Sequence, residues 1–208
     1  MSITLVLIIV TGLISYQAFN DQSLKNKLLQ RPYLEHHQKE YYRLITNGFV
    51  HANWTHLLIN MYVLFVFGEY VESVFLSMFG AMKGRLFYLM LYLFTIVASS
   101  IPTHFKHKDN QYYAGLGASG ATSGILFSFI LFNPWSQLLL FFIIPCPALI
   151  AAFLFLFYSS WASKNSNDNI AHDVHFYGAV FGFLFTVALN PEVFVNFLTR
   201  VMHESPFW

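Results

Sequence analysis

The chain has 208 residues, of which 56% are apolar and 10% are charged. This composition excludes an ordinary water-soluble domain and is typical of a protein that crosses a membrane several times. The formal net charge of +1 argues against a nucleic-acid partner. The single cysteine, Cys146, excludes an internal disulfide and a multi-cysteine zinc site.

Six apolar segments predict six membrane-spanning helices in one domain that covers residues 1–208. In chain order they are residues 3–19, 54–75, 86–101, a short segment from 115 or 119 to 133, then 147–162 and 170–189. The second is expected to be interrupted near its far end by Gly68-Glu69 and Glu72, and the third to stop at Pro102, because proline is disfavoured inside a helix. The predicted fold class is therefore an all-α membrane protein.

The segments between the spans carry signals of their own. Residues 20–50 hold no spanning run but many aromatic and aliphatic side chains, which predicts a long structured first loop at the membrane interface. Residues 103–113 are expected to form a polar loop, and residues 138–144 a re-entrant or interfacial segment ahead of Pro147. A hinge is expected over residues 163–169, and a short interfacial amphipathic segment after the last span.

The second, fourth and sixth spans contain polar side chains of a kind that is costly in hydrocarbon. They form three pairs at helical spacing: His56 with Asn60, Ser119 with Ser123, and His172 with His175. Alternate spans enter the membrane from the same side, and each pair lies in the first turn or two of its span. All three pairs are therefore expected near one membrane face and at similar depth, which indicates a common site.

These residue types match the needs of nucleophilic catalysis, which are a hydroxyl, a base within reach and donors to an oxyanion. Ser119 is the candidate nucleophile and His175 the candidate base. The His56 ring and the Asn60 amide are candidate oxyanion donors, together with backbone N–H groups at the start of the fourth span. Asp173 is two positions from His175 and so points to nearly the opposite side of the helix. A two-residue Ser–His arrangement is the better fit.

Glycines surround the candidate catalytic residues. Gly117 and Gly120 flank Ser119, and Gly178 and Gly182 form a G-x-x-x-G stripe below His175. Small residues at this spacing allow two membrane helices to approach closely. These glycines are expected to bring the fourth and sixth spans together, and His172 is expected to support the site rather than to react.

Three motifs give the chain a family resemblance. They cover residues 51–60 (HANWTHLLIN), 117–124 (GASGATSG) and 171–182 (AHDVHFYGAVFG). In this order and spacing they resemble rhomboid intramembrane serine proteases, and residues 142–148 resemble the segment before the fifth helix of that family. One position departs from the family pattern, because Tyr42-Arg43 stands where Trp-Arg is usual.

The resemblance implies a six-helix rhomboid-type bundle and a Ser119–His175 dyad, with an oxyanion site of His56, Asn60 and the Ser119 backbone. It implies cleavage of single-span membrane proteins in or near the transmembrane segment, with no metal and no cofactor. Substrates would enter sideways past the second and fifth helices. The expected location is the plasma membrane of a bacterium, with a cytoplasmic N-terminus and the active site opening to the other side.

The loops assigned to the outer side would hold eight of the eleven basic residues, which opposes the positive-inside rule. The fifth span carries five large rings, which are expected to close it against the second span by packing: Phe153, Phe155, Phe157, Tyr158 and Trp161.

Three alternatives remain open. The polar residues could serve helix packing alone, although that explains each cluster separately and not their common level. Four histidines at one face (His51, His56, His172 and His175) could ligate a metal or haem, although no H-E-x-x-H is present. The chain could also be a rhomboid-like pseudoprotease that binds membrane proteins without cutting, although it retains both Ser119 and His175.

Overall fold

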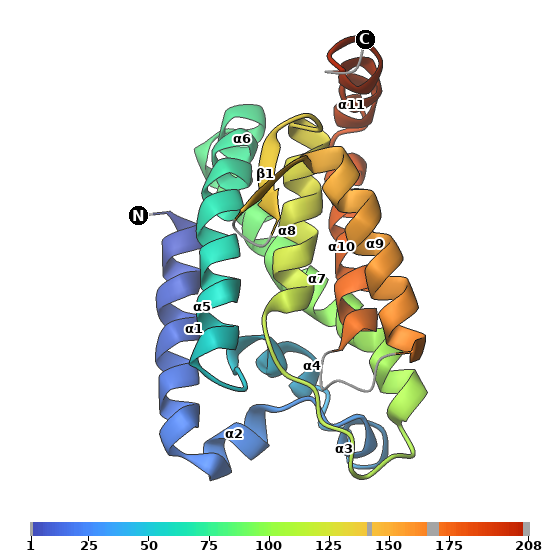
Figure 1. Cartoon of the computed structure of the whole chain (residues 1–208). Helices are drawn as coiled ribbons and strands as arrows, with labels where there is room; N and C mark the ends of the chain where they lie inside the picture. Colours follow the sequence, from blue (N-terminus) through green and yellow to red (C-terminus); the bar gives the residue numbers. More distant parts are fainter. Residues whose placement is uncertain (1, 141–142, 166–170, 206–208) are drawn as a thin grey trace.

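The computed structural model describes residues 2–140, 143–165 and 171–205, and the described chain is mostly helical (Figure 1). The first half contains α1 (Ile3–Asn20), α2 (Gln22–Leu28), α3 (Pro32–His37), α4 (Arg43–Thr46), a 3₁₀ turn (Asn47–Phe49), α5 (Trp54–Val63), a π-helical segment (Leu64–Gly68) and α6 (Glu69–Phe79). The second half contains α7 (Ala81–His107), α8 (Ser119–Phe132), β1 (Gln137–Leu140), β2 (Ile144–Pro147), α9 (Ala148–Asn165), α10 (His172–Leu189) and α11 (Glu192–His203).

Four of the described helices are long and apolar enough to cross a membrane. They are α1, the continuous helix Trp54–Phe79, α7 and α10. Two further apolar helices, α8 and α9, are shorter. Helix α8 runs through the middle of the bundle (Figure 1), and its Ile125 packs in one core with Tyr88 and Tyr92 of α7. The chain is thus a mostly helical membrane protein.

The second predicted span is not interrupted at Gly68-Glu69, which corrects the expectation from the sequence. A π-helical segment carries the helix past this point to Phe79. The acidic residues that suggested a break instead accept hydrogen bonds from the start of α1. Glu72 accepts from the Ile3 and Thr4 N–H groups at 2.8 and 2.9 Å. A carboxylate is favourable there because the first turn of a helix has unpaired N–H groups and a positive dipole end.

The third predicted span does not stop at Pro102, and residues 103–107 belong to α7 rather than to a polar loop. An interior proline costs about 3 kcal/mol because it removes a hydrogen bond and crowds the preceding turn. Contacts with the segment between α1 and α5 offset this cost. Among them, His104 Nδ1 lies 2.7 Å from Glu35 Oε2, and Gln30 Nε2 donates to the Ser100 carbonyl at 3.0 Å.

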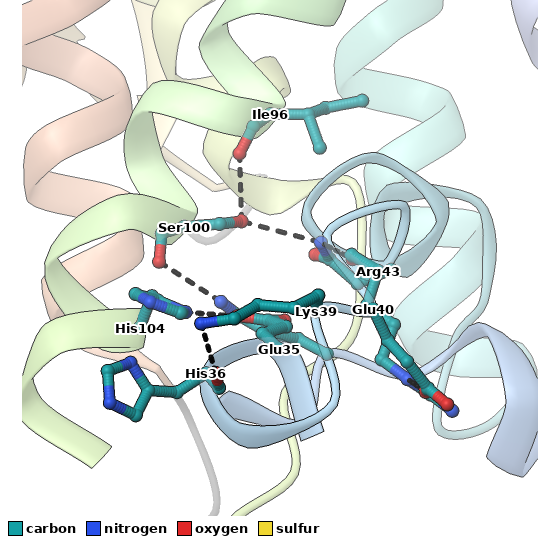
Figure 2. Close-up of polar contacts among 10 residues, drawn as sticks. Glu35, His36, Lys39, Glu40, Arg43, Ile96, Ser100 and His104 are labelled. Atoms are coloured by element: carbon teal, nitrogen blue, oxygen red, sulfur yellow. Dashed lines mark hydrogen bonds and ion pairs between the residues drawn. The ribbon is translucent and has the colours of Figure 1, made fainter. Parts of the chain in front are cut away.

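The segment between α1 and α5 is folded onto α7, as Figure 2 shows. Arg43 Nε donates to Glu40 at 2.6 Å, and Arg43 also donates to the Leu29 carbonyl. Glu35 is fully buried against His104. Burial raises the pKa of Glu35, and its bond with His104 opposes that rise. This polar cluster fixes the folded segment to the end of the bundle where α5, α8 and α10 begin.

Strands β1 and β2 pair antiparallel over most of the predicted re-entrant segment, with Gln137 opposite Pro147, and residues 141–142 lie outside the described residues. In a two-stranded sheet each strand has one edge without a hydrogen-bonding partner. Proline has no N–H to donate, so the prolines of β2 are tolerated in such a strand. Helix α9 begins at Ala148, one residue after the predicted start, and Phe142 lies outside the described residues. Of the predicted hinge, residues 163–165 belong to α9 and residues 166–169 are not described. The predicted tail segment is α11.

Candidate active site

Four predicted site residues line one pocket. Ser119, His175, His56 and Asn60 surround a cavity of about 540 Å³ that lies between α5, α8, α9 and α10. Ser119 is the first residue of α8, and His56 and His175 lie in the first turns of α5 and α10. The first residues of these three helices lie at the same end of the bundle in Figure 1.

The backbone before Ser119 is set by a glycine. Gly117 has a φ of +116°, which favours glycine, and its N–H donates to the Asn47 carbonyl at 2.9 Å. A Cβ at this position would lie 2.7 Å from Cε1 of His56, so no larger residue fits without moving that ring. Gly117 therefore allows the chain to turn into α8 with the His56 side chain directly beside it.

Helices α8 and α10 meet backbone to backbone. A Cβ on Gly178 would lie 2.8 Å from the carbonyl carbon of Gly120, and a Cβ on Gly124 would lie 2.9 Å from the Gly178 carbonyl oxygen. Gly182 faces Gly124 in the same way. The expected close approach of the two helices is present. It fixes the helix that carries Ser119 against the helix that carries His175.

A buried histidine holds the residue before Ser119. The Ala118 N–H donates to Nε2 of His51 at 3.3 Å, which places the proton of the neutral ring on Nδ1. Nδ1 lies 2.9 Å from Ser15 Oγ, which in turn donates to the Phe49 carbonyl at 2.9 Å. Burial lowers the pKa of His51 to about 3, with a smaller effect from the nearby His56. This chain of bonds connects α1 to the start of α8.

The orientation of Asn60 is set by two partners. Its Nδ2 donates to the His56 carbonyl at 2.9 Å, and its Oδ1 accepts from Thr122 Oγ1 at 3.1 Å. Sequence reasoning missed Thr122 and Ser15. Thr122 was detectable in principle, because it lies one turn after Ser119, whereas nothing in the sequence connects Ser15 to the site.

Two other predicted residues lie beside the pocket. His172 is 4% exposed, and its ring is perpendicular to that of His175 with centroids 6.0 Å apart. Asp173 Oδ2 lies 3.8 Å from Lys106 Nζ, and Oδ1 accepts from the Val174 N–H. This agrees with the expectation that Asp173 points away from His175.

The expected closure of α9 against α5 is wrong for four of its five rings. Phe153, Phe157, Tyr158 and Trp161 are 67%, 75%, 51% and 53% exposed, and Tyr158 contacts His172 of α10 instead. On this side the pocket is bordered by Phe155 of α9 and by Ile59 of α5. Within the described part of the chain, no group of three or more His, Cys, Asp or Glu side chains is arranged to hold a metal ion.

Comparison with known proteins identifies the family. The Rhomboid domain model matches residues 38–192, which includes all the pocket residues named above. The chain belongs to the rhomboid family. Among curated rhomboid relatives, "RHOMBOID-like protein 12, mitochondrial" of Arabidopsis thaliana is 28% identical over 174 residues, which cover 80% of this chain and 51% of that protein. "Rhomboid-like protein 11, chloroplastic" of the same plant is 33% identical over 93 residues, which cover 45% of this chain and 30% of that protein. The rhomboid chain described here thus matches about half or less of the length of these relatives.

Proposed function

We propose that the chain is an intramembrane serine endopeptidase that cleaves single-span membrane proteins with a Ser119–His175 dyad. One observation carries this proposal. Ser119, His175, His56 and Asn60, from three helices far apart in the sequence, line the same mostly apolar pocket. A hydroxyl, an imidazole and several N–H donors at one apolar site are the parts that acyl transfer requires.

The proposed reaction uses each residue in turn. His175 accepts the proton of Ser119 as its Oγ attacks the scissile carbonyl. In this proposal the His56 ring, the Asn60 amide and the Ser119 N–H donate hydrogen bonds to the oxyanion. Ser119 is the first residue of α8, where backbone N–H groups have no partner within the helix. His175 then gives the proton to the leaving amine, and water hydrolyses the acyl-enzyme.

The proposed fold for this function is a single domain with six spans, α8 and α9 being the two shorter ones. Helix α8 has 14 residues and so extends about 21 Å, less than the roughly 30 Å hydrocarbon core. A short central helix would place Ser119 below the membrane surface.

The proposed orientation puts the active-site end of the bundle on the outside of the cell. A thiol reagent added to intact cells should then label Lys27→Cys, at the active-site end, and should not label His203→Cys on α11. The reverse labelling pattern would show that the active-site end faces the cytoplasm.

The expected bacterial plasma membrane remains a prediction, and the organellar names of the two relatives do not support it. The same names motivate an alternative function. Both relatives are called rhomboid-like rather than proteases, so a catalytically silent protein that binds membrane segments in the pocket is the second candidate. The protease and the silent binder differ in one measurable respect, which is whether the Ser119 hydroxyl reacts.

The deciding experiment compares the two serines of α8 that line the pocket, Ser119 and Ser123. The protein, purified in detergent, is tested on a panel of transmembrane peptides and with a fluorophosphonate probe. Ser119→Ala and His175→Ala should remain folded but lose cleavage, whereas Ser123→Ala should retain activity, because its N–H lies inside the helical ladder. Labelling that persists in Ser119→Ala and is lost in Ser123→Ala would refute the assignment. A wild-type protein that is not labelled at all would favour the silent binder.

A further inference from the structure

Helix α9 packs through a stripe of small side chains, together with Leu156 and one large ring. The small residues are Ala148, Ala152, Ser159 and Ala162, which are 7% exposed or less, and Leu156 packs in the same cluster. Phe155 lies in the middle of the same stripe, at the position that the helical repeat requires, and is half-buried. Phe155 is the aromatic side chain of this packed face, and the rings that it contacts indicate what it does.

The Phe155 ring lies against the proposed catalytic base. Its plane is within 21° of the His175 ring plane, with centroids 6.2 Å apart, which is the geometry of an offset stack. The Phe155 ring also contacts Phe127 of α8, with centroids 5.9 Å apart, and it lines the pocket. Phe155 therefore touches both helices that carry the proposed dyad.

The next turn of α9 repeats this contact. Tyr158, three residues after Phe155, lies perpendicular to His172, with ring centroids 5.3 Å apart. His172 precedes His175 by three residues, so two rings of α9 face two imidazoles of α10. Two contacts one turn apart fix the register between the helices as well as their separation.

We propose that Phe155 is a positioning residue that holds the plane of the His175 imidazole, an inference that rests on the proposed function. A base that takes a proton from Ser119 and later delivers it to the leaving amine must keep its ring plane through both steps. A stacked aromatic face restricts rotation of the imidazole without forming a hydrogen bond to either of its nitrogens. It also excludes water from that face of the ring.

The test uses three variants of α9, measured with full-length protein in detergent on one transmembrane peptide. Phe155→Leu removes the ring but keeps an apolar side chain, Phe155→Tyr keeps the ring, and Phe153→Leu is the matched control at a position that is 67% exposed. Misplacing a reacting group by about 1 Å costs up to about 10²-fold in rate. We expect Phe155→Leu to lower kcat about tenfold with KM within about twofold of wild type. Phe155→Tyr should recover most of the loss, and Phe153→Leu should behave as wild type.

Two results would overturn the inference alone: an unchanged kcat in Phe155→Leu, or a loss in Phe155→Tyr as large as in Phe155→Leu. Thermal unfolding of each variant separates a positioning effect from a folding defect, because a purely structural role would lower the unfolding temperature without the split between kcat and KM. Ser119→Ala, measured alongside, tests the proposed function itself. Cleavage that persists without the Ser119 hydroxyl, or a wild-type protein that neither cleaves nor reacts with a fluorophosphonate, would overturn both.

Discussion

Replacing Gly178 by alanine should separate the two helices that carry the proposed dyad. The added Cβ would be closest to the carbonyl oxygen of Gly120, the residue after Ser119, and would lie 2.8 Å from its carbonyl carbon and 2.9 Å from its Cα. Carbon atoms prefer about 3.5–4.0 Å, so α8 and α10 must part by roughly 1 Å. All three contact atoms belong to the backbone of Gly120 and none to a flexible side chain, so the strain falls on the backbones of the two helices.

The cost of this change has two parts. Overpacking costs about 1–3 kcal/mol, and the better helix propensity of alanine returns about 1 kcal/mol. The unfolding temperature should therefore fall only modestly. A displacement of about 1 Å between nucleophile and base costs on the order of 10²-fold in rate, so peptide cleavage should fall far more than stability.

Gly12→Ala provides the matched control, because a Cβ on this glycine of α1 has nothing within 4 Å. It should leave activity unchanged and stabilise the protein by up to about 1 kcal/mol. Cleavage rates and thermal unfolding of both variants are measured in the same detergent. Full activity in a stably folded Gly178→Ala protein would refute the argument that this helix contact sets the distance between Ser119 and His175.

Three further predictions concern other parts of the chain. Glu35→Ala should destabilise the protein by about 3 kcal/mol in chemical unfolding, because it leaves His104 buried without its carboxylate partner. Asp109→Ala, which removes the exposed ion pair with His37, should cost less than about 0.5 kcal/mol. Equal losses of stability in the two variants would contradict this prediction. Burial lowers the pKa of His51 from 6.5 to about 3, so below pH 6.5 the unfolded state binds a proton that the folded state does not. The free energy of unfolding should therefore fall by up to about 1.4 kcal/mol per pH unit as the pH drops below 6.5. His51→Gln should flatten this pH dependence, and an unchanged slope would exclude His51 as its source. Trp161→Ala, at a side chain that is 53% exposed, should leave cleavage unchanged or higher in a folded protein, and a large loss would count against this.

The parts of the site that sequence reasoning placed correctly follow from periodicity and alternation. Asn60 follows His56 by one helical turn, and alternate spans enter the membrane from one side, so their first turns lie at one level. These rules need no knowledge of packing. They were enough to bring His56, Asn60, Ser119 and His175 to one pocket.

The features that were predicted wrongly depend on contacts between distant segments. Pro102 and Glu72 each looked like a helix boundary by local rules. The first is tolerated because the last turn of α7 contacts Glu35, and the second accepts hydrogen bonds from the start of α1. Similarly, no local pattern connects Ser15 to Ala118, which are joined only through the His51 ring. Such contacts link residues tens of positions apart, which single-sequence patterns do not encode.

The two contacts on either side of the base differ in kind, and this difference makes the glycine and phenylalanine variants separable. Between α8 and α10 the closest atoms are backbone atoms of Gly120, Gly124 and Gly178, so a change there moves whole helices and affects both stability and rate. Between α9 and α10 the contact is a ring against a ring, so trimming Phe155 leaves the backbones in place and removes side-chain packing against the His175 and Phe127 rings. Gly178→Ala should therefore act on kcat by displacing a helix, whereas Phe155→Leu should act on kcat through the His175 ring, with a stability loss limited to one half-buried side chain. If both variants gave the same combined loss, helix position rather than ring orientation would be the quantity that the packing around His175 controls.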